Sequence, residues 1–396
     1  MKKNLLFVIP SLAAGGGEKS LINLLSQVDY NSYNVDLLLF HKSGVFLNVL
    51  PKQVNIVEPL GDYQTFKYSL NRSVRKFIRS RKIQLAYVRL TFALKNRIIK
   101  DTSKAEQYTW KYQSESMDIL EKEYDTAIGY LEKSSIYFVV DKVKSKRKIG
   151  WIHTNYTNSG MDHHFDQPYF NQLDQIVTVS EECAKSLKEN FRGIGNKVKV
   201  IYNIVSPTLI HKLSDSSIKD SFCTEQNEII LMTIARLSHE KGLDIAIRSC
   251  EQLVDKGYNI KWHVIGEGNE RNKLEEMIKK RELEDHFKLL GLRENPYPYL
   301  KKADIYIQPS RYEGKSIAID EAKILHKPII VTNYETAKDQ ITNEINGLIV
   351  DMNEQGLSEG IERLIQNQDF KHSFINNLSN EQLGTENEIN KLYEII

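Results

Sequence analysis

The chain has 396 residues, which is too long for one ordinary hydrophobic core and predicts two domains of about 150 to 200 residues. With 41% hydrophobic and 27% charged residues and no run of about 18 apolar residues, the composition excludes a disordered chain and a membrane-spanning one. The formal net charge is only +2, but residues 67–104 hold twelve Lys or Arg against one acid, Asp101. This positive lobe on an otherwise acidic body predicts an anionic surface as partner.

Cysteine and histidine spacing argues against a disulfide framework and against a metal site. The three cysteines are odd in number, widely separated and free of any C-x-x-C pattern: Cys183, Cys223 and Cys250. His163 and His164 are adjacent, but no third ligand lies at a suitable spacing. A cytoplasmic location fits this pattern. The apolar start at residues 5–9 stops at Pro10, so it is interpreted as a buried strand and not as a signal peptide.

The first elements in the chain predict a strand, a glycine loop, a helix and a second strand. The strands are expected at 4–9 and 35–40, and the helix at 18–28. Such a unit belongs to a parallel sheet, and its loop at Gly15, Gly16 and Gly17 lies where these sheets bind ligands. A plain turn remains the alternative, because three glycines are not the dinucleotide-binding fingerprint.

The basic segment 67–104 predicts a helix with an apolar stripe. The stripe consists of apolar residues at helical spacing among the arginines: Val74, Phe77, Ile78, Leu85 and Val88. Such a helix can lie on an anionic bilayer, where each basic residue adds about 1 kcal/mol of attraction. The alternative is the solvated face of a helix docked on its own domain. Nucleic-acid binding is disfavoured, because no nucleic-acid-binding pattern accompanies the charge.

The rest of the first half predicts three more strands and the end of the first domain. A strand at 149–153 carries His153 to its end, where the side chain is either a substrate contact or hydrogen-bonded structure. Further strands are expected at 176–179 and 198–201. Pro207 and the polar residues after it mark a linker, so the boundary is placed near residue 204.

The second half restarts the alternation of strands and helices. Arg236 follows a strand at 228–235, and Lys241 precedes a helix that begins near Leu243. Two cations there suit a diphosphate whose charge grows as it leaves; a solvated basic loop is the alternative. The other expected strands are 260–265, 287–290, 303–308, 328–332 and 345–350. The expected helices are one ending at about 280, then 317–325, 357–365, 370–378 and 386–396, the last with Thr385 as N-cap.

Two glutamates with seven residues between them stand at the centre of the second half. Glu313 lies in the loop after the strand at 303–308, whereas Glu321 lies in the following helix and leans back toward its start. Both carboxylates therefore face the space before a helix N-terminus, where unpaired N–H groups attract phosphate. This arrangement suits a polyol such as a sugar carried beside an anion.

The order of these motifs resembles the retaining glycosyltransferases of family 4. The resemblance runs from the first strand to about residue 350 and rests on the glycine loop with Glu18, on His153, on the Arg236–Gly242 and Gly266–Gly268 loops, and on Glu313 to Glu321. It implies an α/β protein with the GT-B fold: two facing Rossmann-like domains with parallel sheets and an interdomain cleft. The implied division is an acceptor-binding domain at 1–203, a nucleotide-sugar-binding domain at 204–377, and a C-terminal helix at 378–396 that packs back on the first domain.

The resemblance also implies a role for each matching residue. Arg236 and Lys241 would hold the diphosphate, Glu321 the ribose hydroxyls, and Glu313 the donor sugar near the reacting bond. Gly291, Leu292 and Arg293 would read the base, Gly15 and Gly16 would close over the phosphates, and His153 would contact the transferred sugar. Lys315, Ser316 and Ile317 would complete the donor site through backbone N–H groups. The family usually has an aromatic residue and a glycine where this chain has Lys315 and Ser316, which admits an acidic or phosphorylated substrate.

The predicted function is the transfer of a hexose or N-acetylhexosamine from a nucleotide diphosphate sugar, most often UDP-linked, with retention of configuration. The expected acceptor is a lipid-linked oligosaccharide or polyol-phosphate polymer at the inner face of the cytoplasmic membrane. No cofactor or metal is expected, because the chain lacks an Asp-x-Asp pair and carries its own cations. The alternatives are a non-catalytic partner of an active transferase and a nucleotide-sugar epimerase or phosphorylase.

Overall fold

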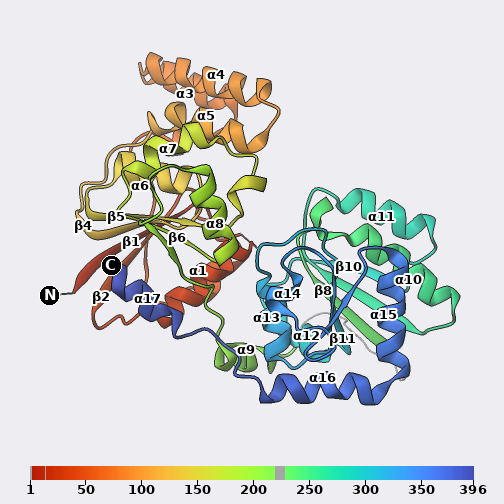
Figure 1. The fold of residues 1–396 in the computed structure, drawn as a ribbon. Coiled ribbons are helices and arrows are strands. Elements are labelled where there is room, and N and C mark those ends of the chain that lie inside the picture. Colours follow the sequence, from red (N-terminus) through yellow and green to blue (C-terminus); the bar gives the residue numbers. More distant parts are fainter. Residues whose placement is uncertain (1, 14, 219–227) are drawn as a thin grey trace. The chain divides into compact units, whose positions relative to one another are not determined.

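A computed structural model describes residues 2–13, 15–218 and 228–396, which form two compact units (Figure 1). The first unit contains the chain up to Asn203 together with Asn387–Ile396, and the second contains Ile204–Glu386. Each unit has one parallel sheet between helices, which is the arrangement of a Rossmann-like domain. The sequence-based boundaries lie at 203/204 and 377/378, whereas the compact units change at 203/204 and 386/387.

The sheet of the first unit has seven parallel strands in the order β3-β2-β1-β4-β5-β6-β7. Leu5 to Ile9 in β1 are all fully buried, because helices cover both faces of the sheet. β3 and β4 were not among the predicted strands. The bounds are β1 Lys3–Ile9, β2 Tyr33–Leu39, β3 Asn55–Val57, β4 Tyr124–Gly129, β5 Ser145–Ile152, β6 Gln175–Thr178 and β7 Val198–Val200.

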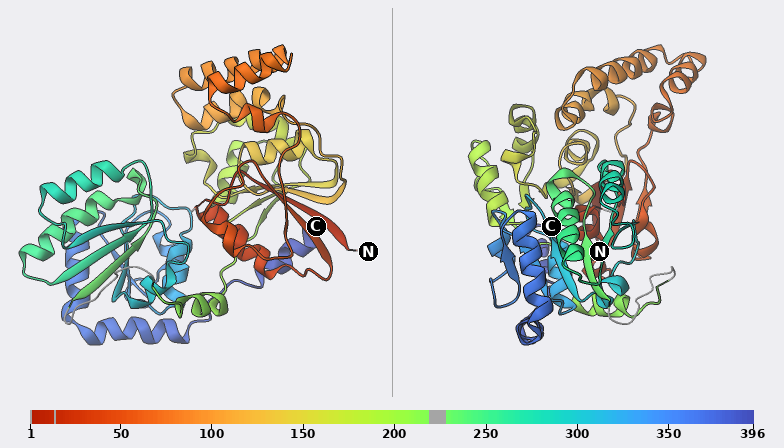
Figure 2. Two further views of the ribbon diagram at one scale, coloured as in Figure 1. Left: turned by 180° about the vertical axis from the view of Figure 1, so that it is seen from behind. Right: turned by 90° about the vertical axis from the view of Figure 1, so that its right-hand side faces the viewer.

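Helices on one side of this sheet are stacked in layers. α6 packs on β1, β4 and β5, α5 packs on α6, α4 on α5, and α3 on α4. Figures 1 and 2 therefore show α3 and α4, in orange, at the end of the unit away from the sheet. The helices of this unit are α1 Gly16–Gln27, α2 Tyr63–Phe66, α3 Leu70–Arg79, α4 Ile83–Ile98, α5 Thr102–Ser114, α6 Ser134–Lys142, α7 His163–Asn171, α8 Glu181–Asn190 and α17 Glu388–Ile395, with 3₁₀ turns at Val45–Val49 and Tyr156–Asn158.

The apolar stripe predicted for the basic segment is mostly core. The segment forms α3 and α4, joined by a turn in which Arg81 has a φ of 58°. Phe77 and Val88 from the predicted stripe are buried in a small cluster with Phe66. These residues fix the two helices to their own unit, so they cannot also face a partner.

The C-terminal helix belongs to the first unit. The Tyr393 ring of α17 stacks on Tyr33 of β2 at 5.4 Å between ring centroids. Lys3 Nζ donates to the carbonyl of Ile396 at 3.0 Å, and an Arg147 guanidinium N–H donates to the carbonyl of Ile395 at 3.1 Å. One lysine and one arginine thus donate to oxygens that a helix C-terminus leaves without partners.

The sheet of the second unit has six parallel strands in the order β10-β9-β8-β11-β12-β13. Successive residues alternate between two buried clusters, so that Leu231 lies in one and Met232 in the other. Apolar side chains on both faces explain why each strand is an almost continuous apolar run. The bounds are β8 Ile229–Ile234, β9 Ile260–Ile265, β10 Phe287–Gly291, β11 Ile305–Gln308, β12 Ile329–Thr332 and β13 Leu348–Val350.

Helices cover both faces of the second sheet. α10, α11, α15 and α16 contribute to the cluster on one face, and α9, α12, α13 and α14 to the cluster on the other. Their bounds are α9 Pro207–Ser214, α10 Leu243–Asp255, α11 Arg271–Lys280, α12 Tyr297–Lys302, α13 Ile317–Ile324, α14 Ala337–Gln340, α15 Glu354–Gln366 and α16 Gln368–Asn380, with a 3₁₀ turn at His239–Lys241.

One predicted helix cap is wrong. Asn387, and not Thr385, is the N-cap of α17, and its side chain makes no capping hydrogen bond. Thr385 is used instead by the second unit, because its backbone N–H donates to the Val205 carbonyl at 3.0 Å and its hydroxyl accepts from the Val205 N–H at 2.8 Å. Tertiary pairing thus competes with capping for the same side chain.

The cysteines of the described residues form no disulfide, and the helices there are unsuited to crossing a membrane. Cys183 and Cys250 are free and buried, and Cys223 lies outside the residues that the structure describes. None of the helices within the described ranges combines the length and the apolar character needed to cross a membrane.

Candidate functional site

Several of the predicted site residues follow the carboxyl ends of the strands that flank the point where each strand order reverses. In the second unit this point lies between β8 and β11, and in the first between β1 and β4. Loops that leave neighbouring strands in opposite directions open a crevice there, which is the usual ligand site of an open parallel sheet. Arg236 and Lys241 follow β8 and Glu313 follows β11, so the fold brings the predicted cations and one glutamate to one place.

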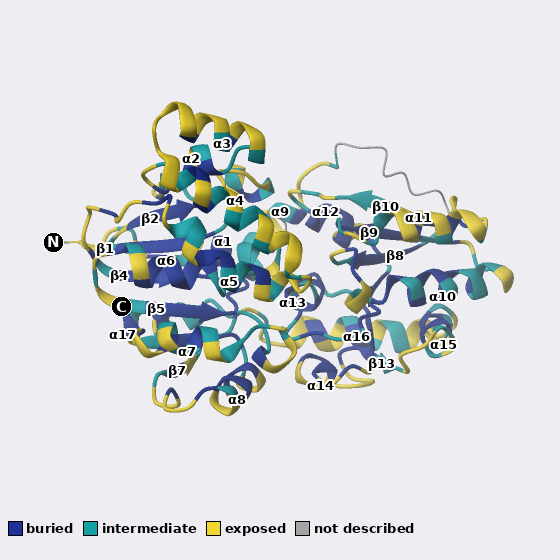
Figure 3. Ribbon diagram, turned by 90° about the horizontal axis from the view of Figure 1, so that it is seen from above, coloured by how far each residue is buried: buried dark blue, intermediate teal, exposed yellow. Residues whose placement is uncertain are grey.

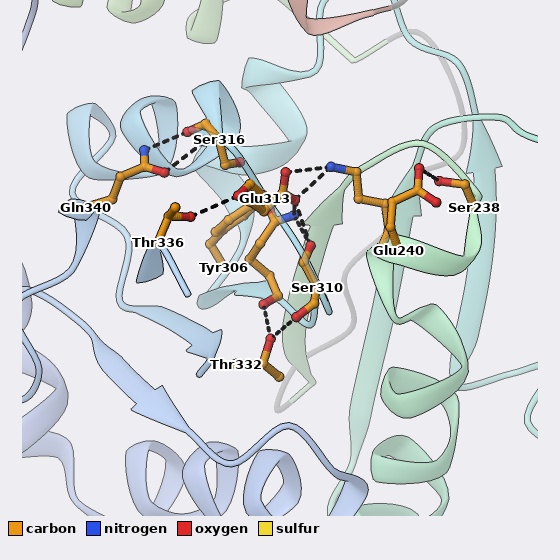
Figure 4. Close-up of polar contacts among 11 residues, drawn as sticks. Ser238, Glu240, Tyr306, Ser310, Glu313, Ser316, Thr332, Thr336 and Gln340 are labelled. Atoms are coloured by element: carbon orange, nitrogen blue, oxygen red, sulfur yellow. Dashed lines mark hydrogen bonds and ion pairs between the residues drawn. The ribbon is translucent and has the colours of Figure 1, made fainter. Parts of the chain in front are cut away.

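Lys241 and Glu313 form a two-pronged ion pair. Lys241 Nζ lies 2.7 Å from both carboxylate oxygens of Glu313 (Figure 4). The Glu313 side chain is only 7% exposed and that of Lys241 21% exposed, so water screens this pair little. Arg236, by contrast, is an exposed side chain two residues beyond the end of β8. Of the two side chains predicted to bind a diphosphate, Arg236 is therefore open to solvent and Lys241 is held by a carboxylate.

Neutral donors fix the Glu313 carboxylate from the side of the sheet. Gln308 Nε2 and Ser310 Oγ each donate to Glu313 Oε1 at 2.7 Å, and the Tyr306 hydroxyl donates to Gln308 Oε1 at 2.5 Å (Figure 4). The Tyr306 bond orients the Gln308 amide so that its nitrogen faces the carboxylate. The Glu313 carbonyl accepts from Thr336 Oγ1 at 3.0 Å. This network leaves Glu313 one orientation, which is what a group near a reacting bond requires.

A second ion pair ties the Lys241 loop to the Glu313 loop. Arg311 donates from both terminal nitrogens to the two oxygens of Asp244, at 2.7 and 2.8 Å, and also to the His239 carbonyl at 2.9 Å. Burial by itself would raise the pKa of Asp244, but hydrogen bonds and charge from Arg311 and Arg248 lower it to about 2. The bidentate clamp holds the two loops in register.

Gly242 allows the same two loops to approach closely. Its φ is 63°, in the left-handed region, and an added Cβ would lie 1.9 Å from the Pro309 carbonyl oxygen. Any side chain there would push Lys241 away from the loop that carries Glu313. The glycine is therefore required by the geometry of the ion pair.

The residues around α13 are placed by hydrogen bonds within the unit. Glu321 is fully buried, and its Oε1 accepts from the Tyr297 hydroxyl at 2.9 Å. Gln340 holds Ser316 through two hydrogen bonds of 2.8 Å, one from the Ser316 N–H and one to its carbonyl (Figure 4). The Ser316 backbone donor is thus already engaged. Ile317, the first residue of α13, is buried.

Lys315 lies beside a partly buried acid, Asp320. Its Nζ is 4.0 Å from Asp320 Oδ2, and Gln340 Nε2 donates to Asp320 Oδ1 at 2.9 Å. Burial raises the pKa of Asp320, and the charge of Lys315 opposes that rise. The cation that departs from the family pattern therefore compensates a carboxylate of the helix that follows it.

The turn expected to read a base follows β10. Gly291 ends the strand, and its carbonyl accepts from the Gly266 N–H at 3.0 Å. Arg293 Nε donates to the Tyr299 hydroxyl at 3.2 Å, while Leu292 keeps 40% of its surface exposed. The turn lies at the carboxyl edge of the second sheet, one strand further from the switch point than the Gly266 loop.

The first unit brings its glycine loop beside His153. An added Cβ at Gly17 would lie 2.6 Å from Leu131 Cδ2 and 3.7 Å from His153 Cγ. Gly15 is the N-cap of α1, and a Cβ at Gly16 would have none of the described atoms within 4 Å. The loop after β1 thus runs next to the histidine that follows β5, and its Gly16 position is open.

His153 is neutral over most of the pH range. Burial lowers the pKa of its imidazole to about 4, although a hydrogen bond with the Tyr130 backbone works in the opposite direction. Its Nε2 is buried and has no hydrogen-bond partner among the described residues. A neutral imidazole with an unsatisfied nitrogen can accept from or donate to a ligand hydroxyl.

Glu132 is the main site residue that sequence reasoning missed. It follows β4 on the other side of the switch point, and its Oε1 accepts from the backbone N–H groups of His153 and Thr154 at 2.5 and 2.9 Å. Burial raises the pKa of Glu132. The signal that could have found it is the run Ala127–Gly129 before Tyr130, which reads as the end of a buried strand, and a carboxylate follows it at the sheet edge.

Metal ligation has little support in the described residues. The rings of His163 and His164 lie 4.0 Å apart at the start of α7. Over residues 2–13, 15–218 and 228–396, no group of three His, Cys, Asp or Glu side chains could hold a metal ion.

Comparison with known proteins found a family match within the second unit. Residues 215–381 match the family described as Glycosyl transferases group 1. A N-acetylgalactosamine-N,N'-diacetylbacillosaminyl-diphospho-undecaprenol 4-alpha-N-acetylgalactosaminyltransferase of Campylobacter jejuni is 25% identical over 211 residues, 52% of this chain and 55% of that protein. A poly(ribitol-phosphate) alpha-N-acetylglucosaminyltransferase of Staphylococcus aureus is 25% identical over 233 residues, 57% of this chain and 45% of that protein. The chain spans about half the length of the curated relatives it matches.

A solved structure shares the whole fold. The Anabaena protein HepE, in complex with UDP-glucose, has a TM-score of 0.68 at 18% identity, over 99% of this chain and 98% of that one. At this identity the likeness establishes the fold alone. The chain has the GT-B fold, with two Rossmann-like domains built on parallel sheets.

Proposed function

We propose that this protein is a retaining glycosyltransferase of family 4. It moves a sugar from a UDP-sugar onto a membrane-associated acceptor, such as a lipid-linked oligosaccharide or a polyol-phosphate polymer. The observation that carries the proposal is the pairing of Lys241 with Glu313 at the switch point of the second sheet, within the segment that matches Glycosyl transferases group 1. A cation and a carboxylate in contact at a ligand crevice suit a sugar bonded to a diphosphate.

Lys241 and Arg236 provide positive charge for the departing diphosphate. Breaking the bond between sugar and phosphate places additional negative charge on the leaving group, and fixed cations stabilise that charge. Lys241 is already oriented by Glu313, and Arg236 is free to close on the phosphates from solvent. We therefore propose that no metal is required, and that a chelator such as EDTA leaves the transfer rate unchanged.

Glu313 has two tasks in this scheme. In the ligand-free protein its carboxylate holds Lys241, and with donor bound it faces the positive charge that develops on the sugar ring as the bond to phosphate breaks. Gln308 and Ser310 keep the carboxylate in place when Lys241 turns toward the diphosphate. The leaving phosphate takes the acceptor proton on the same face, so the configuration is retained without a second acidic side chain.

The acceptor is proposed from the relatives. The Campylobacter relative acts on a diphospho-undecaprenol compound, and the Staphylococcus relative acts on poly(ribitol-phosphate). Both carry phosphate, and the first unit of this chain carries the surplus of Lys and Arg in residues 67–104. A phosphate-bearing acceptor is thus the class we assign, with a hexose or N-acetylhexosamine as the transferred sugar. The roles of Gly15, Gly16 and His153 are those that the family resemblance implies.

A donor panel tests the proposal. The purified chain is incubated with UDP-, GDP- and ADP-linked sugars, with and without a polyprenyl-diphosphate glycan or a polyol-phosphate polymer, and release of nucleoside diphosphate is measured. We expect release from a UDP-sugar that rises with acceptor and an α-linked product by NMR, and we expect Lys241→Ala to abolish most of it. Binding of donor without release under any condition would contradict the proposal and identify a non-catalytic partner.

A further inference from the structure

One face of α4 carries exposed apolar side chains along its entire length. They recur at spacings of three and four residues, so they lie on one side of the helix. The opposite side is held by Val88 and by Leu85 and Phe92, which pack on Phe66 and Phe77. The exposed residues, with the fraction of surface left open, are Ile83 (60%), Tyr87 (69%), Leu90 (48%), Leu94 (58%) and Ile98 (66%).

This concentration is unusual within the described parts of the chain. Of the twelve large apolar residues that remain exposed there, six lie between Ile78 and Ile98. A stripe that spans the sixteen residues of α4 is about 24 Å long, at 1.5 Å per residue. Single exposed apolar residues need no explanation, but a contiguous row of this kind marks a surface that binds something.

The surroundings of the stripe are strongly basic. Between residues 67 and 100 the chain contains no acidic residue. Most of the basic side chains of α3, α4 and the residues next to them are exposed: Arg72, Arg75, Lys76, Arg79, Arg81, Lys82, Arg97 and Lys100. Figure 3 shows that α3 is exposed over much of its length. Arg89 is an exception, because it is partly buried and donates to the carbonyls of Phe66 and Tyr68. The apolar stripe is thus flanked by cations and by no anions of its own segment.

We propose that the α3–α4 hairpin docks on an anionic lipid bilayer, with the stripe from Ile83 to Ile98 inserted at the boundary of headgroups and acyl chains. Lys and Arg at the flanks then contact lipid phosphates, and the Tyr87 hydroxyl stays at the headgroup level. The inner residues named above anchor the hairpin to its own unit, so the outer stripe is left for the lipid.

The charge pattern favours lipid over a second copy of the chain. Pairing two α4 helices through this stripe would bring two segments with no acidic residues between 67 and 100 against each other, and like charges in contact are unfavourable. An anionic bilayer satisfies the apolar face and the cations together. The inference does not depend on the proposed transfer reaction, although docking would bring the first unit to a lipid-linked acceptor.

Vesicle co-sedimentation of the full chain tests the proposal. We expect the protein to pellet with vesicles of phosphatidylcholine and phosphatidylglycerol, to stay in the supernatant with pure phosphatidylcholine, and to dissociate as salt rises. The double substitution Leu90→Ser with Leu94→Ser should lower the partition coefficient about tenfold or more, because both side chains lose their transfer into the apolar layer. Ile119→Ser is the matched control, since Ile119 is 52% exposed in the same unit but lies outside the hairpin.

A tryptophan probe reports insertion directly. The native residues Trp110, Trp151 and Trp262 are all at most 1% exposed, so Tyr87→Trp adds the only tryptophan on the surface of the described residues. Its emission should shift to shorter wavelength with anionic vesicles and not with pure phosphatidylcholine. Leu90→Ser and Leu94→Ser in the same background should remove the shift.

Sedimentation velocity without lipid tests the alternative that a second copy of the chain covers the apolar stripe. A monomer whose lipid binding is lost in the Leu90→Ser, Leu94→Ser protein supports docking on lipid. A dimer that this double substitution dissociates, with vesicle partition unchanged, would overturn the proposal in favour of a second copy. Equal recovery in the supernatant with every vesicle would overturn it as well. Neither result depends on transferase activity, so the outcome is separate from that of the donor panel.

Discussion

The two sheets have the same strand order around their switch points but carry opposite kinds of chemistry there. In the second unit, Lys241 and Glu313 form a charged pair, and Gln308 and Ser310 also donate to the Glu313 carboxylate. In the first, a glycine loop lies beside His153, whose pKa near 4 keeps it neutral. The shared topology supplies a crevice in each unit, and the residues that follow the two switch strands decide what each can bind.

The two crevices therefore suit different kinds of ligand. Fixed charges suit a diphosphate, whose charge changes during transfer, whereas a neutral imidazole and open backbone suit uncharged hydroxyl groups. Each unit also has a carboxylate that fixes the loop after the neighbouring strand of its sheet. Asp244 does this through Arg311 in the second unit, and Glu132 does it through backbone N–H groups in the first.

The largest effect is expected from breaking the charged pair. Glu313→Gln and Lys241→Ala should each lower turnover at least about tenfold, roughly 1.4 kcal/mol of transition-state stabilisation. Lys241→Ala should also lower the free energy of unfolding by about 3 kcal/mol, because it leaves the buried Glu313 carboxylate without its cation. Steady-state kinetics and urea denaturation measure the two effects.

A double variant separates stability from catalysis at the same pair. Lys241→Ala combined with Glu313→Gln should recover most of the stability, because no buried charge remains unpaired, but not the turnover. Lys273→Ala is the control, since its pair with Glu270 lies on the surface and should change stability by less than about 1 kcal/mol. Unchanged turnover in both single variants would refute the assignment of the pair.

The next effect concerns the neutral histidine of the first unit. A folded pKa of about 4 lies below the value of 6.5 for an exposed histidine, so stability is full above pH 6.5 and is lost as the pH falls toward 4. The loss at about pH 5 should be roughly 2 kcal/mol, and His153→Asn should remove it. NMR titration of the imidazole and urea denaturation at about pH 7.5 and about pH 5 measure this.

His263 offers a matched comparison in the second unit. Burial lowers the pKa of its imidazole to about 4 as well, with help from the charge of Lys288. His263→Asn should therefore lessen the acid sensitivity of the second unit without changing turnover, whereas His153→Asn should change both. Titration of the His153 resonance near pH 6.5 would contradict the lowered pKa of this imidazole.

A smaller effect is expected from the clamp between the two loops of the charged site. The pKa of Asp244 is lowered from 3.8 to about 2, so its contribution is present above pH 3.8 and is lost as the pH falls toward 2. Asp244→Asn should cost about 1 to 2 kcal/mol at neutral pH, after allowance for the partial exposure of the pair. Denaturation at neutral pH measures the cost, and an unchanged midpoint would show that Arg311 contributes nothing measurable.

The smallest effect is expected at Glu132. Glu132→Ala removes the acceptor of two backbone N–H groups and should displace His153. We expect this displacement to raise the activation free energy of turnover by about 1 kcal/mol. Glu132→Gln keeps an acceptor oxygen, so it should restore most of the rate. Equal loss in both variants would show that the charge of Glu132, and not its placement of His153, is what matters.

Local patterns were enough for much of the fold. Strands such as 260–265 and the helices after Arg236 and Glu313 were visible as apolar runs and helical spacing, because those patterns belong to a few consecutive residues. β4 was missed because Asp125 and Thr126 interrupt its apolar run, and Glu132 was missed with it. The cap at Thr385 was misassigned because its partner, Val205, lies far away in the sequence.

The alternation of strands and helices in two halves, and the charged and glycine residues that follow the strands, were readable from the amino-acid order alone. The folded protein was needed to see that Lys241 contacts Glu313 and that Arg311 binds Asp244. It was also needed to see which apolar stripe of the basic segment is core and which is exposed. The reason is that periodicity and strand ends are written in neighbouring residues, whereas an ion pair or a buried helix face depends on segments that only folding brings together.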